Sequence, residues 1–208
     1  MFLNVIAYAV EIAAGTHTAD TQSLFDHGAL YGAAVTQHGQ WWRIGTGAFM
    51  HGGLTHLALN MVALWQIGRE LEVTIGPGRT LAIYVASLVA SGLAVVHFAP
   101  SDVTVGASGA IFGLFGALLA VGVRLGARGR QLVRRILPII AINLAFTFAI
   151  PFISKAGHLG GLVAGFLVGL VLYVVEGAPV SRGLTVDVVD EAGLHARAEL
   201  LPPERPHG

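Results

Sequence analysis

The sequence has no cysteine and few charged residues, and each shortage excludes a class of protein. Without cysteine, the chain can form no disulfide, thiolate metal site or cysteine nucleophile. Charged residues occupy only 12% of the 208 positions, against roughly 25% in soluble domains. Twelve basic residues balance twelve acidic ones, so the basic surface that binds nucleic acid and the net charge typical of disordered chains are both missing.

What the sequence has in excess is apolar residues, which form 54% of the chain and give a mean hydropathy of +0.71. A membrane-spanning helix needs about 20 mostly apolar residues. Charged and Pro/Gly-rich breaks divide the chain into six candidate stretches, the first of them short. The sequence therefore predicts an all-α, polytopic membrane helix bundle over residues 1–175, with six transmembrane helices in the lipid bilayer. The stretches are Met1–Ala14, Phe49–Leu71, Thr80–Ala99, Val105–Val123, Ile136–Phe152 and Gly157–Val175.

Basic residues in the short loops predict how this bundle is oriented. Arg69 and Arg79 flank the second loop, whereas the first, third and fifth loops together hold only Arg43 and Lys155. Because Lys and Arg favour cytoplasmic loops, the even-numbered loops and both termini are predicted to be cytoplasmic, in a multi-pass protein of the cell membrane. The strongest signal is the fourth loop, which is crowded by Arg124, Arg128, Arg130, Arg134 and Arg135.

Two segments are too polar to span the membrane. Residues 16–48 are too long for a tight connection and are predicted to form a long outer first loop, in which Trp41 and Trp42 suit the membrane interface. Residues 176–208 are predicted to be a short cytoplasmic tail, partly disordered, with one strand-like alternation at 186–190.

Glycines at helical spacing predict that two of the spans pack closely. In the fourth span, Gly109 and Gly113 begin one stripe, and in the sixth span glycine recurs at every fourth position from Gly157 to Gly169. Small residues let membrane helices approach until their backbones touch. By themselves such stripes indicate packing only.

A serine and a histidine lie beside these stripes. Ser108 adjoins Gly109, and His158 shares a helical face with Gly161. Both lie at the predicted outer ends of their spans, so they share one depth on helices that are expected to touch, as a nucleophile and its general base must. Gly106 and Gly109 allow a tight turn around the serine, and the start of a helix offers unpaired N–H groups to an oxyanion.

The second span adds His51, His56 and Asn60. His56 and Asn60 share a face and can both donate to an oxyanion in one pocket, or they can serve as hydrogen-bonding contacts between helices. A metal held by His51, His56 and His158 is disfavoured by the spacing of the first two and the lack of an accompanying carboxylate. No metal or cofactor is therefore expected. Since the carboxylates fall elsewhere, a Ser-His dyad is predicted in preference to a triad.

In their order along the chain, these motifs resemble those of the rhomboid intramembrane serine proteases, from roughly residue 4 to residue 175. The resemblance implies that Ser108 is the nucleophile and His158 its general base. It also implies an oxyanion hole made by His56, Asn60 and the Ser108 backbone N–H. The matching pieces are Trp42-Arg43, His51-xxxx-His56-xxx-Asn60, Gly106-Ala107-Ser108-Gly109 with Gly113, and His158-Leu159-Gly160-Gly161 with Gly165.

The resemblance also assigns supporting roles. Phe112 is expected to stack on the catalytic imidazole, while His51 and Arg43 hold the outer loop and the top of the second helix. The fifth span is expected to be the mobile side through which substrate enters.

The predicted function is that of a serine endopeptidase that cleaves the transmembrane segments of single-pass membrane proteins near their outer end. The alternative is a catalytically inactive relative that binds and escorts membrane proteins. A second rival is a small transporter that uses its intramembrane histidines as a proton relay, although the sequence shows no inverted repeat. Association into a homo-oligomer stays open.

Overall fold

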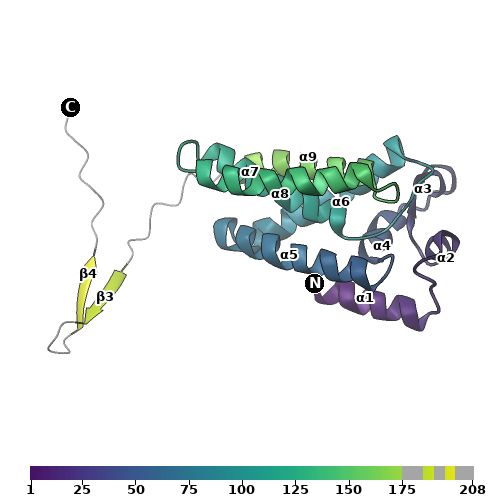
Figure 1. The fold of residues 1–208 in the computed structure, drawn as a ribbon, viewed down its shortest axis with the longest axis horizontal. Coiled ribbons are helices and arrows are strands. Elements are labelled where there is room, and N and C mark those ends of the chain that lie inside the picture. Colours follow the sequence, from purple (N-terminus) through teal and green to yellow (C-terminus); the bar gives the residue numbers. More distant parts are fainter. Residues whose placement is uncertain (175–184, 190–194, 200–208) are drawn as a thin grey trace. The chain divides into compact units, whose positions relative to one another are not determined.

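The computed structural model describes residues 1–174, 185–189 and 195–199. Contacts within the chain separate it into two units, Met1–Val175 and Glu176–Gly208. The first unit is a helical body in which each of the six predicted apolar stretches overlaps one long helix (Figure 1). These helices are α1 (Phe2–Ala13), α5 (Leu54–Ile75), α6 (Pro77–Phe98), α7 (Ser108–Arg124), α8 (Arg130–Ala149) and α9 (Lys155–Val174).

Three of these helices are long and apolar enough to cross a membrane. Within the described residues they are α6, α8 and α9, judged by length and composition. Helices α1 and α7 are apolar but shorter, and α5 carries Arg69, Glu70 and Glu72 in its second half. The sharp break between α5 and α6 comes from Gly76, at φ +90°, followed by Pro77 at the first position of α6, because proline is favoured at a helix start and cannot continue a helix.

Helix α7 packs against four of the other long helices, α9, α6, α8 and α5, and Figure 1 shows it beside α8 and α9. The predicted close packing of the two glycine-bearing spans is present. A Cβ on Gly161 would overlap the carbonyl oxygen of Gly109, and one on Gly165 would overlap that of Gly113. The backbones of α7 and α9 are therefore in direct contact along a shared stripe, as small residues in membrane helices allow.

Residues 16–48 are not an irregular loop, because they fold into short helices and one strand. Strand β1 pairs antiparallel with β2, which immediately precedes the segment leading into α7. The backbone N–H of Gly106 also donates to the Gly47 carbonyl at 2.9 Å. This early part of the chain thereby fixes the entry to α7. The elements of this early part are α2 (Thr21–Asp26), β1 (Leu30–Tyr31), α3 (Gly32–His38) and α4 (Arg43–Phe49), and the partner strand later in the chain is β2 (Val103–Thr104).

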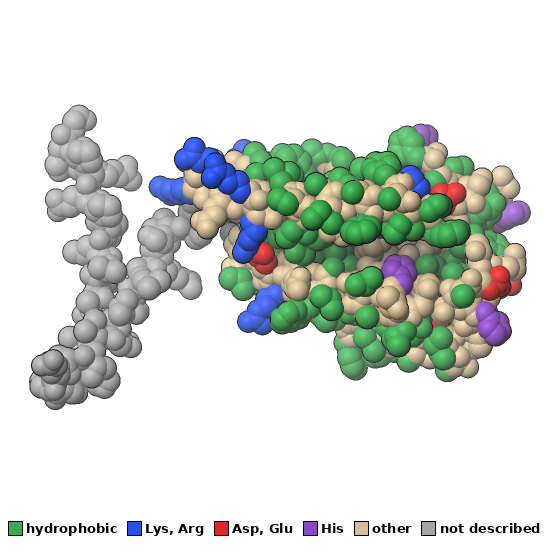
Figure 2. Space-filling model, viewed as in Figure 1, with side chains coloured by type: hydrophobic (Ala, Val, Ile, Leu, Met, Phe, Trp, Pro, Cys, Tyr) green, Lys and Arg blue, Asp and Glu red, His purple; other side chains and the backbone are tan. Residues whose placement is uncertain are grey.

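The two ends of the body differ in charge. On the face shown in Figure 2, most Lys and Arg side chains gather where α7 meets α8, and His side chains appear toward the opposite end. We call the end with the Lys and Arg side chains the arginine end. The opposite end is called the serine end, because α7 begins there with Ser108. Near the arginine end, Arg135 of α8 forms an ion pair with Glu70 of α5.

The second unit holds strands β3 (Thr185–Val189) and β4 (His195–Glu199), which pair antiparallel. The strand-like stretch predicted at residues 186–190 corresponds to β3, while β4 was not predicted. The prediction of an all-α fold thus describes the helical body, and short strands accompany it. The predicted partial disorder of the tail concerns residues that lie outside the described ones.

Candidate active site

Ser108 is the first residue of α7, and two positions before it lies Gly106, which no other residue could replace without strain. Gly106 has φ +114°, a conformation that L side chains rarely adopt. A Cβ at this position would also lie 2.8 Å from His56 Cε1. The turn before Ser108 can therefore approach His56 only because residue 106 has no side chain.

His158 of α9 meets this serine. Its Nε2 lies 2.7 Å from Ser108 Oγ, and the residue is only 8% exposed. The ring stacks on Phe112, one turn further along α7, with centroids 4.2 Å apart and planes inclined by 20°. The Gly109–Gly161 backbone contact lies next to both residues, so the packing of α7 on α9 sets the distance between hydroxyl and imidazole.

The other imidazole nitrogen also has a partner, which the sequence reasoning missed. His158 Nδ1 lies 2.8 Å from Thr147 Oγ1 of α8, at the position where a triad would place a carboxylate. A single threonine in an apolar helix carries no signal in the sequence, because its hydroxyl usually bonds to its own backbone. Only the packing of α8 against α9 reveals this contact.

His56 and Asn60 of α5 both face Gly106. A Cβ on Gly106 would lie 2.9 Å from His56 Nε2 and 3.8 Å from Asn60 Nδ2. His56 Nδ1 accepts the Gly52 N–H at 3.3 Å, so its proton sits on Nε2. Asn60 Nδ2 donates one hydrogen to the His56 carbonyl at 3.0 Å and keeps a second one. Two N–H donors thus point at the turn before Ser108.

Arg43 and His51 lie behind these groups. Arg43 NH1 donates to the carbonyls of Phe25 and Ala29 at 2.7 and 2.8 Å, and its guanidinium lies over the rings of Phe25 and Trp42. It therefore ties three parts of residues 16–48 together.

His51 is fully buried, and its backbone N–H donates to Glu11 Oε2 at 3.3 Å. This contact with α1 was not predicted either. The His51 ring meets that of His56 edge to face, with centroids 5.2 Å apart. In the described part of the chain, no cluster of three or more His, Cys, Asp or Glu side chains is arranged to hold a metal.

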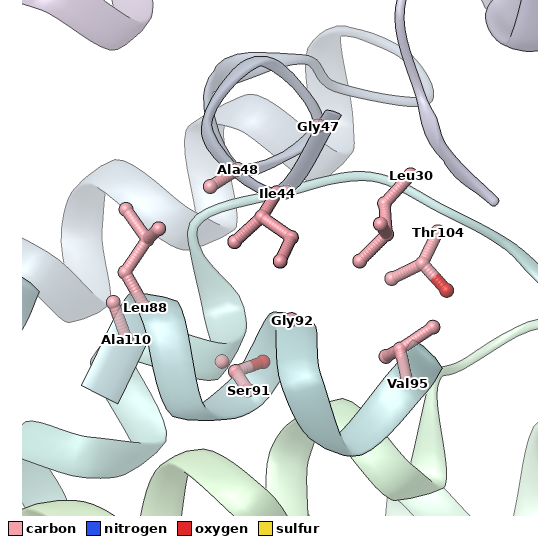
Figure 3. A pocket seen from close by; sticks show the side chains of 12 residues that line it. Leu30, Ile44, Gly47, Ala48, Leu88, Ser91, Gly92, Val95, Thr104 and Ala110 are labelled. Atoms are coloured by element: carbon pink, nitrogen blue, oxygen red, sulfur yellow. The ribbon is translucent and has the colours of Figure 1, made fainter. Parts of the chain in front are cut away.

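A hollow lies between α4 and α6, beside the turn that carries Ser108 (Figure 3). Ile44, Leu88 and Val95 give it apolar walls, and Ser91 and Thr104 supply polar side chains. Gly106 and Gly109, which flank the serine turn, also line it. The hollow is therefore next to the backbone of the candidate nucleophile.

Long apolar helices packed through glycine, with basic side chains gathered at one end and histidines toward the other, define a helical membrane protein. Comparison with known proteins narrows this class. Residues 38–175 match the family model described as the Rhomboid domain. The chain therefore belongs to the rhomboid family, as its motifs predicted.

Individual relatives agree. The rhomboid protease GluP of Bacillus subtilis (strain 168) is 40% identical over 168 residues, which cover 79% of this chain and 32% of the relative. RHOMBOID-like protein 5 of Arabidopsis thaliana is 35% identical over 143 residues, 66% of this chain and 46% of the relative. RHOMBOID-like protein 1 of the same plant is 35% identical over 150 residues, which cover 71% of this chain and 38% of the relative. This chain thus spans less than half the length of these relatives.

Proposed function

We propose that this chain is an intramembrane serine endopeptidase that cleaves transmembrane segments of single-pass membrane proteins. The observation that carries the proposal is the 2.7 Å contact between Ser108 Oγ and His158 Nε2. It lies between two helices whose backbones touch, in a family that includes a relative named as a protease. A hydroxyl at hydrogen-bonding distance from a buried imidazole is the arrangement that activates a serine nucleophile.

In the proposed reaction, Ser108 Oγ attacks the scissile carbonyl carbon while His158 Nε2 accepts the hydroxyl proton. The negative charge on the carbonyl oxygen is stabilised by His56 Nε2–H, Asn60 Nδ2–H and the Ser108 backbone N–H, which has no partner within its helix. His158 then passes the proton to the leaving amine, which gives an acyl-enzyme. Water hydrolyses that ester, with His158 again as the base.

The proposed position of the site in the bilayer follows from α7. Its 17 residues extend about 25 Å, less than the ~30 Å of a hydrocarbon core. In the proposed orientation the arginine end lies at the cytoplasmic surface, all six long helices cross the membrane and both termini are cytoplasmic. Ser108 would then lie below the outer surface of the membrane. Cleavage would then fall near the outer end of a substrate helix, with α8 as the side of entry.

The proposed substrate preference is for helices that unwind easily. In an intact helix each carbonyl accepts a hydrogen bond from four residues further on, and side chains shield the backbone. A peptide bond can reach Ser108 only where this structure opens. Small or helix-breaking residues near the outer end of the substrate segment lower the cost of opening.

The test uses the full chain, purified with and without Ser108→Ala, and a panel of tagged single-pass substrates. The wild type should release fragments whose masses locate the scissile bond, and the variant should release none. A fluorophosphonate probe should label Ser108 in the wild type and fail to label His158→Ala. Cleavage that survives Ser108→Ala would rule out the proposal. Substrate binding by an unlabelled, inactive wild type would favour an escort protein instead.

A further inference from the structure

We propose that Thr147 is a positioning residue for the Ser108–His158 pair. Its hydroxyl accepts a hydrogen bond from His158 Nδ1–H and so holds the imidazole in the one tautomer that leaves Nε2 free to take the Ser108 proton. This inference rests on the proposed function, because it assigns Thr147 a part in the same proton transfer.

The partners of the Thr147 hydroxyl determine where the hydrogen atoms lie. Thr147 Oγ1 donates to the carbonyl of Asn143, one turn earlier in α8, at 2.8 Å. A hydroxyl has a single hydrogen, so toward His158 Nδ1, at 2.8 Å, Thr147 can only accept. Nδ1 must then carry the imidazole proton. Nε2 is left as the lone-pair nitrogen, and it is the atom that lies 2.7 Å from Ser108 Oγ.

Stacking alone would not achieve this. The Phe112 ring fixes the plane of the imidazole, but a ring rotated by half a turn about its Cβ–Cγ bond keeps that plane and exchanges the positions of nitrogen and carbon atoms. The acceptor at Thr147 makes one of the two orientations favourable. It also suits both charge states, since Nδ1 is a donor in the neutral tautomer and in the imidazolium formed during reaction.

Burial supports a dedicated role for this hydroxyl. Within α8, all of which the structure describes, the buried side chains are Ile136, Ile140 and Thr147. Both isoleucines lie nearer the arginine end than Thr147 does, and in the part of α8 that follows Ile140 the buried residue is Thr147, with no exposed surface. A threonine that merely bonded its own backbone could equally face lipid. This one is turned inward onto His158.

The effect of removing the hydroxyl should appear in the chemical step. A hydrogen bond to a charged group is stronger than one to a neutral group, so Thr147 stabilises the imidazolium more than the resting imidazole. Thr147→Val keeps the side-chain shape without the acceptor and should lower kcat and the rate of fluorophosphonate labelling about 10- to 100-fold, with little change in KM. Thr147→Ser restores the acceptor and should recover most of that loss.

The experiment compares wild type, Thr147→Val, Thr147→Ser and Ser108→Ala as full chains, and the thermal unfolding of each variant serves as the folding control. If Thr147→Val is labelled by the fluorophosphonate at the wild-type rate, the role of the hydroxyl is overturned. Equal impairment of Thr147→Val and Thr147→Ser would overturn it as well. A measurement independent of substitution at 147 is the ¹⁵N NMR spectrum of histidine-labelled wild type, with His158 assigned through His158→Ala. It should show a protonated Nδ1, and a protonated Nε2 in the neutral imidazole would overturn the inference even if Thr147→Val does not fold. Cleavage that survives Ser108→Ala refutes the proposed function alone, since the tautomer is read without any substrate.

Discussion

Substitution of Gly161 by alanine should disable the site without touching any chemical group. The new Cβ would overlap the carbonyl oxygen of Gly109. Because the Cβ is rigidly attached to the α9 backbone and the oxygen belongs to the α7 backbone, only a separation of α7 from α9 by about 1 Å or more can relieve the clash. Ser108 and His158 are carried by these two helices, next to the clash. Adding 1 Å to their 2.7 Å contact takes it beyond hydrogen-bonding range. A misplacement of about this size can cost roughly 100-fold in rate, and overpacking costs about 1–3 kcal/mol of stability.

The same substitution one turn earlier provides the matched control. A Cβ on Gly157 would meet the hydroxyl oxygens of Ser154 and Ser91 at 2.9 and 3.1 Å, and these are ends of side chains that can rotate away. Gly157→Ala should therefore retain most activity although it adjoins His158. The assays are cleavage of a tagged single-pass substrate, the rate of fluorophosphonate labelling and thermal unfolding. If Gly161→Ala labels as fast as Gly157→Ala, helix contact does not control the Ser108–His158 distance and the reasoning is refuted.

Three further substitutions test the groups around the pair. Asn60→Ala should lower kcat on the order of 100-fold with little change in KM, as expected for loss of an oxyanion donor; equal loss in KM would point to substrate binding instead. Arg43→Lys should lower the free energy of unfolding by about 1–3 kcal/mol in a denaturant titration, because lysine cannot reproduce the guanidinium contacts to two carbonyls and two rings; unchanged stability would argue against that role. Glu11→Ala leaves the buried His51 N–H without its acceptor and should destabilise the fold by about 1–3 kcal/mol, whereas Glu11→Gln keeps an acceptor and should cost less; equal unfolding temperatures for the two variants would contradict this.

The elements that could be predicted are those with a regular sequence pattern. Long apolar runs mark the helices, and the glycine register identifies which two of them touch. Ser108 and His158 stand out because each adjoins a stripe, so the pattern that predicts packing also predicts which polar side chains it brings together. Although the two glycine-bearing helices lie far apart in the chain, each feature is marked by a repeat within its own segment, and sequence periodicity records such repeats directly.

The features that escaped prediction depend on contacts between residues far apart in the chain. The short helices within residues 16–48 are held by Arg43, whose carbonyl partners lie 14 and 18 residues away. Glu11 meets His51 across 40 residues, and nothing in an isolated buried carboxylate indicates a backbone N–H as its partner. Thr147 acquires its significance only from the packing of α8 against α9. Local pattern cannot encode such contacts, because each is set by the packing of the whole body.

The residues before α5 contribute no group to the proposed reaction, yet they determine where it can occur. Strand β1 pairs with β2, and the Gly47 carbonyl of α4 accepts the N–H of Gly106. These contacts hold the turn before Ser108 in place, whereas His158 is held by α9. In the proposed reaction, the substrate carbonyl occupies the space between Ser108 and the donors on α5. The width of this space therefore depends on how residues 16–48 hold that turn against α5. Changes in this segment should alter kcat through geometry, even where they leave the Ser108–His158 contact intact.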